Sequence, residues 1–487
     1  MVFSSMVFLT FFLPIVFFIY LICPNRARNL FLFIASLVFY AWGEPVYIFI
    51  MLFSTVFDYV NGRLIEHFRT LSREKAARTV LVISVVGNLA ILGFFKYTDF
   101  FIETIDHVSG STIALLGLTL PVGISFYTFQ TMSYTIDVYR GEVAAQHNII
   151  SFGMYVCLFP QLIAGPIVRY KDIAKEVDSR RFTPSEIALG MYRFAIGLSK
   201  KVLIANKAGD IYKNITAIHL SSLTGPEVLI SAICYTIQIY FDFSGYSDMA
   251  IGLGRIFGFH FPENFNYPYE SKSITEFWRR WHMTLGTWFR EYVYIPLGGN
   301  RKGLARQILN LLIVWSLTGF WHGASWNFVL WGLYYFALLL IEKCFMLRVW
   351  KKLPERLGFI RILVTMVFVM CGWILFSHTD LTEAAYYMKT LFSPKAWTAG
   401  FDFRGGHVSA GYQTVYLFRS SVVLMTVGII GATELPHRIF AWFDSKSKRR
   451  GEGQISDLQM LLSLILMLLA VMTLLSDSFN PFLYFRF

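Results

Sequence analysis

The sequence predicts an all-α protein that crosses a membrane many times. Of the 487 residues, 55% are hydrophobic and only 15% are charged, whereas a soluble domain carries roughly 25% charged residues. Apolar runs recur along the chain, and a helix needs about 20 such residues to cross the hydrocarbon core. We therefore expect roughly ten to thirteen transmembrane or re-entrant helices. A large soluble helical protein would need charged faces between its apolar stripes, and the sequence lacks them.

The apolar runs divide the chain from end to end. The clearest are Met6–Cys23, Leu30–Trp42, Val46–Val60, Thr79–Phe95, Pro226–Ile237, Phe328–Ile341, Ile362–Phe376, Val415–Ala432 and Leu458–Leu475. Several are shorter than a full span, so these helices must be extended by polar neighbours, tilt, or end inside the bilayer. No internal repeat or low-complexity linker separates them. We predict one transmembrane domain over residues 1–487, with residues 413–487 as additional C-terminal spans.

The placement of basic residues predicts the orientation of the chain. The formal net charge is +12, and the basic residues gather in short segments between apolar runs, such as Arg63–Arg78 and Arg169–Arg181. Positive charge beside spans marks cytoplasmic loops and contact with anionic lipid. The acidic segment Asp99–Asp106 then falls outside, and so does the N-terminus. We therefore expect the lipid bilayer, and no nucleic acid, as the partner of these charges.

Polar side chains enter the apolar sequence at three places, of which the first is Tyr240–Asp248 (YFDFSGYSD). Polar groups are costly in lipid, so they usually face a protein interior or a watery cavity. The candidate tunnel-lining residues here are Asp242, Ser244, Tyr246 and Asp248. Gly245 would allow a local break in the helix. The cluster is then either the lining of a substrate or proton path or a helix break held by hydrogen bonds.

The second place is Phe277–Gly299, which mixes aromatic and basic residues. At helical spacing Phe277, Trp281 and Trp288 share one face, which predicts an amphipathic helix at the cytoplasmic interface. Simple anchoring would account for such a helix. Arginines beside a buried histidine could instead hold an anionic carrier such as the phosphates of coenzyme A. The candidates in this stretch are Trp278, Arg279, Arg280, His282, Arg290 and Tyr294.

The third place contains the strongest single candidate, His322, between the apolar runs Ile308–Trp315 and Phe328–Ile341. Basic segments before and after predict a hairpin whose first helix rises only about 20 Å, less than the ~30 Å core. His322 should therefore lie inside the membrane near the apex. A lone histidine on an apolar helix is usually a hydrogen-bonded core residue, but the tryptophans, glycines and hydroxyls around this one are typical of a cavity. The neighbouring candidates are Trp321, Ser325 and Asn327.

Other kinds of site have no support in the sequence. The five cysteines are scattered without a CxxC pair, and there is no HExxH, GxxxxGK[ST] or GxSxG pattern, so we predict no metal and no phosphate-binding loop. The histidines near polar or basic segments are expected to face solvent: His67, His147, His219, His378, His407 and His437.

These stretches together resemble the membrane-bound O-acyltransferase family, and within it the alginate O-acetyltransferase branch. The resemblance covers essentially the whole chain. It is carried by FWRRWHMTLGTWFREYVYIPLGG (277–299), TGFWHGASWN (318–327), QLIAGPIVRY (161–170), YFDFSGYSDMAIGLG (240–254), the opening MVFSSMVFL, the YAWGEP turn (40–45) and the ending NPFLYFRF (480–487).

The resemblance implies that His322 is the catalytic histidine and that His282 occupies a second recurring histidine position. It also implies a ring of tilted helices around a central tunnel. The acyl donor would be cytoplasmic acetyl-CoA, held by Arg279–Arg290, and no cofactor would be tightly bound. His322 would be the general base, with Asn327, Ser325 or the Trp321 N–H as oxyanion donors.

By the same resemblance, the acceptor lies on the other side of a bacterial inner membrane. A separate extracytoplasmic polysaccharide O-acetyltransferase, or an acceptor protein, would complete O-acetylation of alginate or a similar exopolysaccharide. D-alanyl transfer to teichoic acid and peptidoglycan O-acetylation are alternatives within the family. From a different class, Asp242, Asp248 and His322 could form the path of a proton-coupled transporter, although the lack of internal repeats weakens this interpretation.

Overall fold

The computed structural model describes residues 1–181, 183–346, 354, 357–404, 409–445, 455–476 and 482–483. All regular elements within these residues are helices. Eight helices in this part of the chain are long and apolar enough to cross a membrane: α3 (Ile48–Thr70), α4 (Glu74–Ser109), α10 (Gly225–Ile256), α13 (Leu304–His322), α14 with its extension (Trp326–Met346), α16 (Gly358–Ser377), α19 (Ala410–Gly431) and α21 (Asp457–Ser476). The predicted all-α, multi-pass membrane fold is confirmed.

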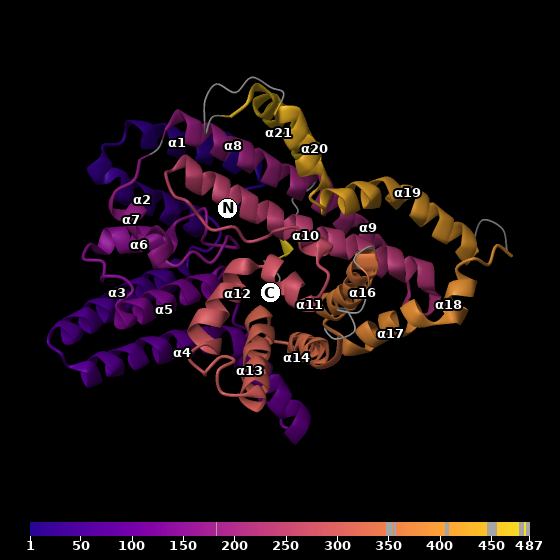
Figure 1. Cartoon of the computed structure of the whole chain (residues 1–487), viewed down its shortest axis with the longest axis horizontal. Coiled ribbons are helices and arrows are strands. Elements are labelled where there is room, and N and C mark those ends of the chain that lie inside the picture. The colour runs from indigo at the N-terminus through magenta and orange to yellow at the C-terminus, as the bar shows by residue number, and fades with distance from the viewer. Residues whose placement is uncertain are drawn as a thin grey trace.

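Shorter helices complete the fold. They are η1 (Phe8–Phe12), α1 (Leu13–Ile22), η2 (Asn25–Ala27), α2 (Arg28–Ala41), α5 (Ile124–Arg140), α6 (Ile149–Cys157), α7 (Tyr170–Asp178), α8 (Pro184–Ser199), η3 (Lys200–Ala205), α9 (Asn206–Thr216), η4 (Leu220–Ser222), η5 (Pro268–Glu270), α11 (Ile274–Arg280), α12 (Met283–Phe289), η6 (Arg290–Tyr294), η7 (Glu342–Met346), α17 (Leu381–Phe392), α18 (Pro394–Ala399) and α20 (Leu435–Asp444). Figure 1 shows α3, α4 and α5 side by side at one end and α17 to α19 at the other.

Helix α10 forms the centre of the molecule (Figure 1). In its most apolar 18-residue window 89% of the residues are buried, compared with 6% for α21, so other helices rather than lipid surround it. The polar segment Tyr240–Asp248 lies inside α10, which runs unbroken from Gly225 to Ile256. Of the two interpretations of this segment, the helix break at Gly245 is therefore wrong.

The glycines of α10 serve close packing against α8 instead. A Cβ on Gly245 would lie 2.7 Å from the carbonyl oxygen of Gly197, and a Cβ on Gly197 would lie 2.5 Å from that of Gly245. Gly190 and Gly252 make the same reciprocal contact, with 2.6 Å in both directions. Small residues at these positions let two membrane helices touch backbone to backbone.

The hairpin expected around His322 is present. Helix α13 ends at His322 and α14 begins at Trp326, so the histidine lies at the apex as predicted. Helix α13 begins at Leu304, earlier than the apolar run, and its 19 residues span about 28 Å. The depth of His322 in the bilayer stays a prediction.

The end of the chain returns to the interior. The amide N–H of Leu483 donates to Asp242 Oδ2 over 2.9 Å, and the ring of Phe482 lies 4.7 Å from that of Tyr246. Most of the predicted C-terminal region is helical, as α19, α20 and α21. The other residues of the NPFLYFRF ending, and His407, lie outside the described residues.

We predict that Gly245→Ala destabilises the protein by about 1–3 kcal/mol, because the added methyl group meets backbone atoms that cannot move aside. The unfolding temperature of the purified protein in detergent measures this loss. Gly93→Ala is the matched control, since a Cβ there meets nothing within 4 Å. Equal unfolding temperatures for the two variants would contradict the packing argument.

Candidate active site

His322 lies in an aromatic enclosure at the end of α13. Its side chain is 7% exposed, and its ring lies 4.9 Å from Trp321, 4.9 Å from Trp331 and 5.2 Å from Phe376. Its Nδ1 atom is buried and has no hydrogen-bond partner among the described residues. A buried polar atom without a partner calls for an explanation, and a catalytic role is one of them.

His322 lines a small inner cavity of about 20 Å³. The cavity is lined by Ile239, Asp242, Phe243, Trp281, His322, Trp331, Trp373, Phe376 and Leu483. These side chains come from α10, α13, α14, α16, the break between α11 and α12, and the end of the chain. The histidine predicted from the hairpin and one carboxylate predicted from α10 therefore meet in one place.

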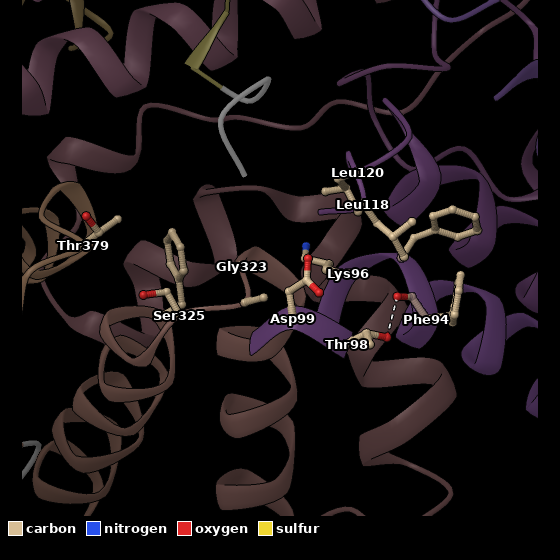
Figure 2. Close-up of a pocket in the computed structure, with 12 residues that line it drawn as sticks. Phe94, Lys96, Thr98, Asp99, Leu118, Leu120, Gly323, Ser325 and Thr379 are labelled. Atoms are coloured by element: carbon tan, nitrogen blue, oxygen red, sulfur yellow. Dashed lines mark hydrogen bonds between the residues drawn. The ribbon is translucent and has the colours of Figure 1, made fainter. Parts of the chain in front are cut away.

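The residues that follow His322 line a second, larger cavity of about 320 Å³, which we call the vestibule. Its walls come from the far half of α4, the segment before α5 and the turn between α13 and α14. Figure 2 shows Lys96 and Asp99 on one side of the vestibule and Ser325 and Thr379 on the other, with Gly323 between them.

Helix α4 holds the end of α13. Lys96 Nζ donates to the carbonyl oxygen of Trp321, and the Tyr97 hydroxyl donates to that of Phe320 over 2.5 Å. Lys96 Nζ also lies 3.4 Å from Ser125 Oγ. The two residues before His322 are therefore bound through their backbone to another helix.

His282 lies at a break that the sequence did not predict. The expected amphipathic surface helix is wrong: α11 ends at Arg280 and α12 begins at Met283, with His282 at φ 47° between them. Left-handed backbone is uncommon in residues other than glycine and costs roughly 1–3 kcal/mol when strained. The tryptophans expected on its membrane face, Trp281 and Trp288, are buried in the core, because the break turns them toward α10 and α5.

Asn264 stabilises this break. Its Oδ1 accepts from the Thr284 N–H over 3.2 Å and the Thr284 hydroxyl over 2.9 Å, and it lies 3.2 Å from His282 Nδ1. The ring of His282 lies 5.7 Å from Trp321. Because Trp321 also contacts His322, the two histidines lie on neighbouring sides of one indole.

The segment of residues 161–171 contacts the region around His282. The N–H of Ile167 donates to Thr284 Oγ1 over 3.0 Å, and Arg169 and Lys171 bind Glu291 Oε2 over 2.6 and 2.9 Å. Partial burial would raise the pKa of Glu291, but hydrogen bonding to Lys171 and the charge of Arg169 hold that pKa below its ordinary value. Residues far apart in the sequence are thus tied together beside His282.

The two carboxylates of α10 have different surroundings. Asp242 pairs with Lys201 and lines the inner cavity. Asp248 pairs with Arg193 and with Lys200, each over 2.6 Å, and is not among the residues that line the cavity of His322. Only Asp242 is therefore placed with the histidine.

The remaining predicted residues divide between the site and its surroundings. Ser325 lines the vestibule, and Trp278 packs edge-on against Trp331, 5.5 Å away. Arg279 and Arg290 are exposed. Other side chains are buried or engaged elsewhere: Ser244 and Tyr246 in α10, Arg280 with Glu276 over 2.7 Å, Tyr294 with Gln307 over 3.2 Å, and Asn327 with the Phe376 and Leu375 carbonyls over 3.3 and 3.4 Å.

Comparison with known proteins decides the family. A family model described as the membrane-bound O-acyltransferase family matches residues 142–379. The chain is 39% identical over 511 residues to a probable alginate O-acetylase of Azotobacter vinelandii, with all of both chains covered. The chain belongs to the membrane-bound O-acyltransferase family. As predicted, it is an O-acyltransferase and a multi-pass membrane protein.

Two other relatives of this O-acyltransferase are named for cell-envelope polymers. It is 34% identical over 424 residues to a peptidoglycan O-acetyltransferase of Helicobacter pylori, with 80% of this chain and 79% of that one covered. It is 30% identical over 274 residues to a teichoic acid D-alanyltransferase of Bacillus subtilis, with 53% and 68% covered.

The structure also shows what sequence reasoning missed in this O-acyltransferase. Lys96 directly follows the apolar run that ends at Phe95 and marks only the end of that run in the sequence analysis. A lone lysine between aromatic residues nevertheless indicates a buried polar position.

His378 was expected to face solvent and is instead buried. Its Nδ1 lies 2.9 Å from the Ile374 carbonyl oxygen, and its ring lies 4.3 Å from that of Tyr387. Among the described residues, no group of three or more His, Cys, Asp or Glu could hold a metal.

We predict that Asn264→Ala lowers the free energy of unfolding by about 1–3 kcal/mol, because it leaves the buried donors of Thr284 without an acceptor. Thermal unfolding of the purified protein measures the change. Asn300→Ala, at an exposed turn position, should have little effect. A similar loss in both variants would show that Asn264 does not stabilise the break at His282.

Proposed function

We propose that this O-acyltransferase takes an acetyl group from cytoplasmic acetyl-CoA and passes it across a bacterial inner membrane for O-acetylation of an extracellular polysaccharide. A partner enzyme or acceptor protein outside the membrane completes the transfer. The observation that carries the proposal is the place of His322, which lines the inner cavity while the residues directly after it line the vestibule. A tunnel past this histidine lets the acetyl group cross while the charged coenzyme stays on its own side.

His322 acts as the general base in this proposal. A hydroxyl oxygen attacks the thioester carbonyl carbon and its proton passes to the imidazole. The carbon–sulfur bond then breaks, and the coenzyme leaves as the thiol after taking that proton. A neutral, buried imidazole with an unoccupied nitrogen suits this task.

The oxyanion that forms in this step needs hydrogen-bond donors. Ser325 lines the vestibule beside His322, and Trp321 contacts the imidazole, so both remain candidates. The amide nitrogen of Asn327 points to the carbonyl groups at the end of α16. We therefore assign Asn327 to holding α14 against α16 rather than to the oxyanion.

Arg279 and Arg290 are the proposed contacts for the coenzyme phosphates. Both are exposed; Arg279 lies in the last turn of α11 before the break that carries His282, and Arg290 begins η6 at the far end of α12. Guanidinium groups bind phosphate in a bidentate manner. Acetyl rather than D-alanyl is the proposed acyl group, because an O-acetylase is matched over the whole chain and a D-alanyltransferase over 53% of it.

We predict that His322→Ala lowers acetyl transfer by at least about 100-fold, the contribution typical of a general base. Transfer of radioactive acetyl from acetyl-CoA is measured in membrane vesicles of a strain that makes the acetylated polysaccharide. His219→Ala, at an exposed loop histidine whose Nδ1 lies 2.8 Å from the Ser221 hydroxyl, is the control. Undiminished transfer by a correctly inserted His322→Ala protein would overturn the proposal.

Arg279 and Arg290 are predicted to set the affinity for the acyl donor. Replacing Arg279 and Arg290 together with alanine should raise the KM for acetyl-CoA by about 10-fold or more, because two charge-assisted phosphate contacts are lost, while kcat stays within about twofold. The initial rates of acetyl transfer at varied acetyl-CoA measure both constants. Arg78→Ala, an exposed arginine on α4, is the matched charge control, and an unchanged KM in the double variant would exclude this site.

A further inference from the structure

Lys96 is an ionisable side chain in a place where a charge is costly. It is 9% exposed and lies on a helix apolar enough to cross the membrane. Among the described residues no carboxylate forms an ion pair with it, and its recorded hydrogen bonds go to the Trp321 carbonyl oxygen and to Ser125 Oγ. Buried ionisable groups in membrane helices are usually tied to function.

The carbonyl that Lys96 binds belongs to the helix end that carries the catalytic histidine. The last four carbonyl groups of an α-helix have no partner inside the helix. Many helices close this end by turning back through a left-handed residue. Helix α13 does not: Gly323 is extended, with φ −172° and ψ 160°, and the chain leaves directly into the vestibule turn.

Helix α4 supplies the missing cap from outside. Lys96 binds the carbonyl of Trp321 and Tyr97 that of Phe320, so two adjacent peptide groups before His322 are fixed from one neighbouring helix. A cation is the preferred partner at a helix C-terminus, where the partial charges of the peptide groups are negative. Tyr97 binds its carbonyl with a neutral hydroxyl, so a comparison of substitutions at positions 96 and 97 separates the effect of a cation from that of a hydrogen bond alone.

We propose that Lys96 is a positioning residue for His322, acting as a cap on α13 from α4 that fixes the histidine between the inner cavity and the vestibule. This inference rests on the proposed role of His322 as general base. Terminal residues of a helix fray without a cap, and a shift of about 1 Å at a reacting group can lower a rate by about 100-fold.

The test compares kcat and KM for acetyl-CoA in the vesicle assay with full-length variants. Lys96→Met fills the same space without the charge and should lower kcat by about 100-fold, with KM for acetyl-CoA within about twofold, because the donor binds elsewhere. Lys96→Arg keeps the cation and should recover at least a tenth of the wild-type kcat. Tyr97→Phe, which loses only the neutral part of the cap, should lower kcat by about 10-fold. Thr104→Val is the control on the same helix, since its hydroxyl donates to the Phe100 carbonyl within α4 over 2.8 Å.

The outcomes separate the two proposals. If His322→Ala transfers acetyl as well as the wild type, the proposed general base is wrong whatever Lys96 does. If His322→Ala is inactive while Lys96→Met keeps the wild-type kcat, the positioning role alone is wrong. Loss in Lys96→Met with equal loss in Lys96→Arg and none in Tyr97→Phe would also overturn it. If Lys96→Met fails to insert, the other two variants decide. At an unchanged unfolding temperature, a kcat about 10-fold lower in Tyr97→Phe supports the positioning role, and a wild-type kcat in both Tyr97→Phe and Lys96→Arg overturns it.

Discussion

The contact between the backbones of α8 and α10 is the constraint on which the centre of the molecule depends. With glycines on both sides, no side chain separates these two helices, and α10 is covered almost completely by protein. A charged group on such a helix is costly unless it is paired within the protein. The segment η3, which continues α8, supplies Lys200 and Lys201, and their ammonium groups meet Asp248 and Asp242. Close approach and charge pairing are therefore two results of the same packing.

The side chain of His322, unlike the carboxylates of α10, has no ion-pair partner within the part of the chain that the structure describes. It lies in an enclosure of aromatic rings that offers contact without hydrogen bonding, and its Nδ1 atom has no partner among the described residues. The surrounding backbone is nevertheless held firmly, by α4 on the side of Phe320 and Trp321. A fixed backbone and an unoccupied ring nitrogen together are what the proposed general base requires.

Local signals in the sequence were enough to predict the hairpin and the place of His322 at its apex, because apolar runs flank a short polar turn. The catalytic role of His322 came from the family resemblance and stays a prediction. The break at His282 could not be predicted, since a left-handed histidine has no compositional signature. Gly245 was misinterpreted because its role depends on Gly197 in another helix. Lys96 was missed for the same reason: its partner carbonyl lies 225 residues later in the chain. Contacts between distant segments are what a single sequence conceals.

The return of Phe482 and Leu483 to the interior affects how the enzyme is made. Leu483 lines the cavity of His322 and binds Asp242 through its backbone, yet it leaves the ribosome after every helix described above. The wall that Leu483 forms is therefore translated after all the helices that form the rest of this cavity. A chain truncated before Phe482 would keep every helix described above but lose one wall of this cavity and the backbone N–H that binds Asp242.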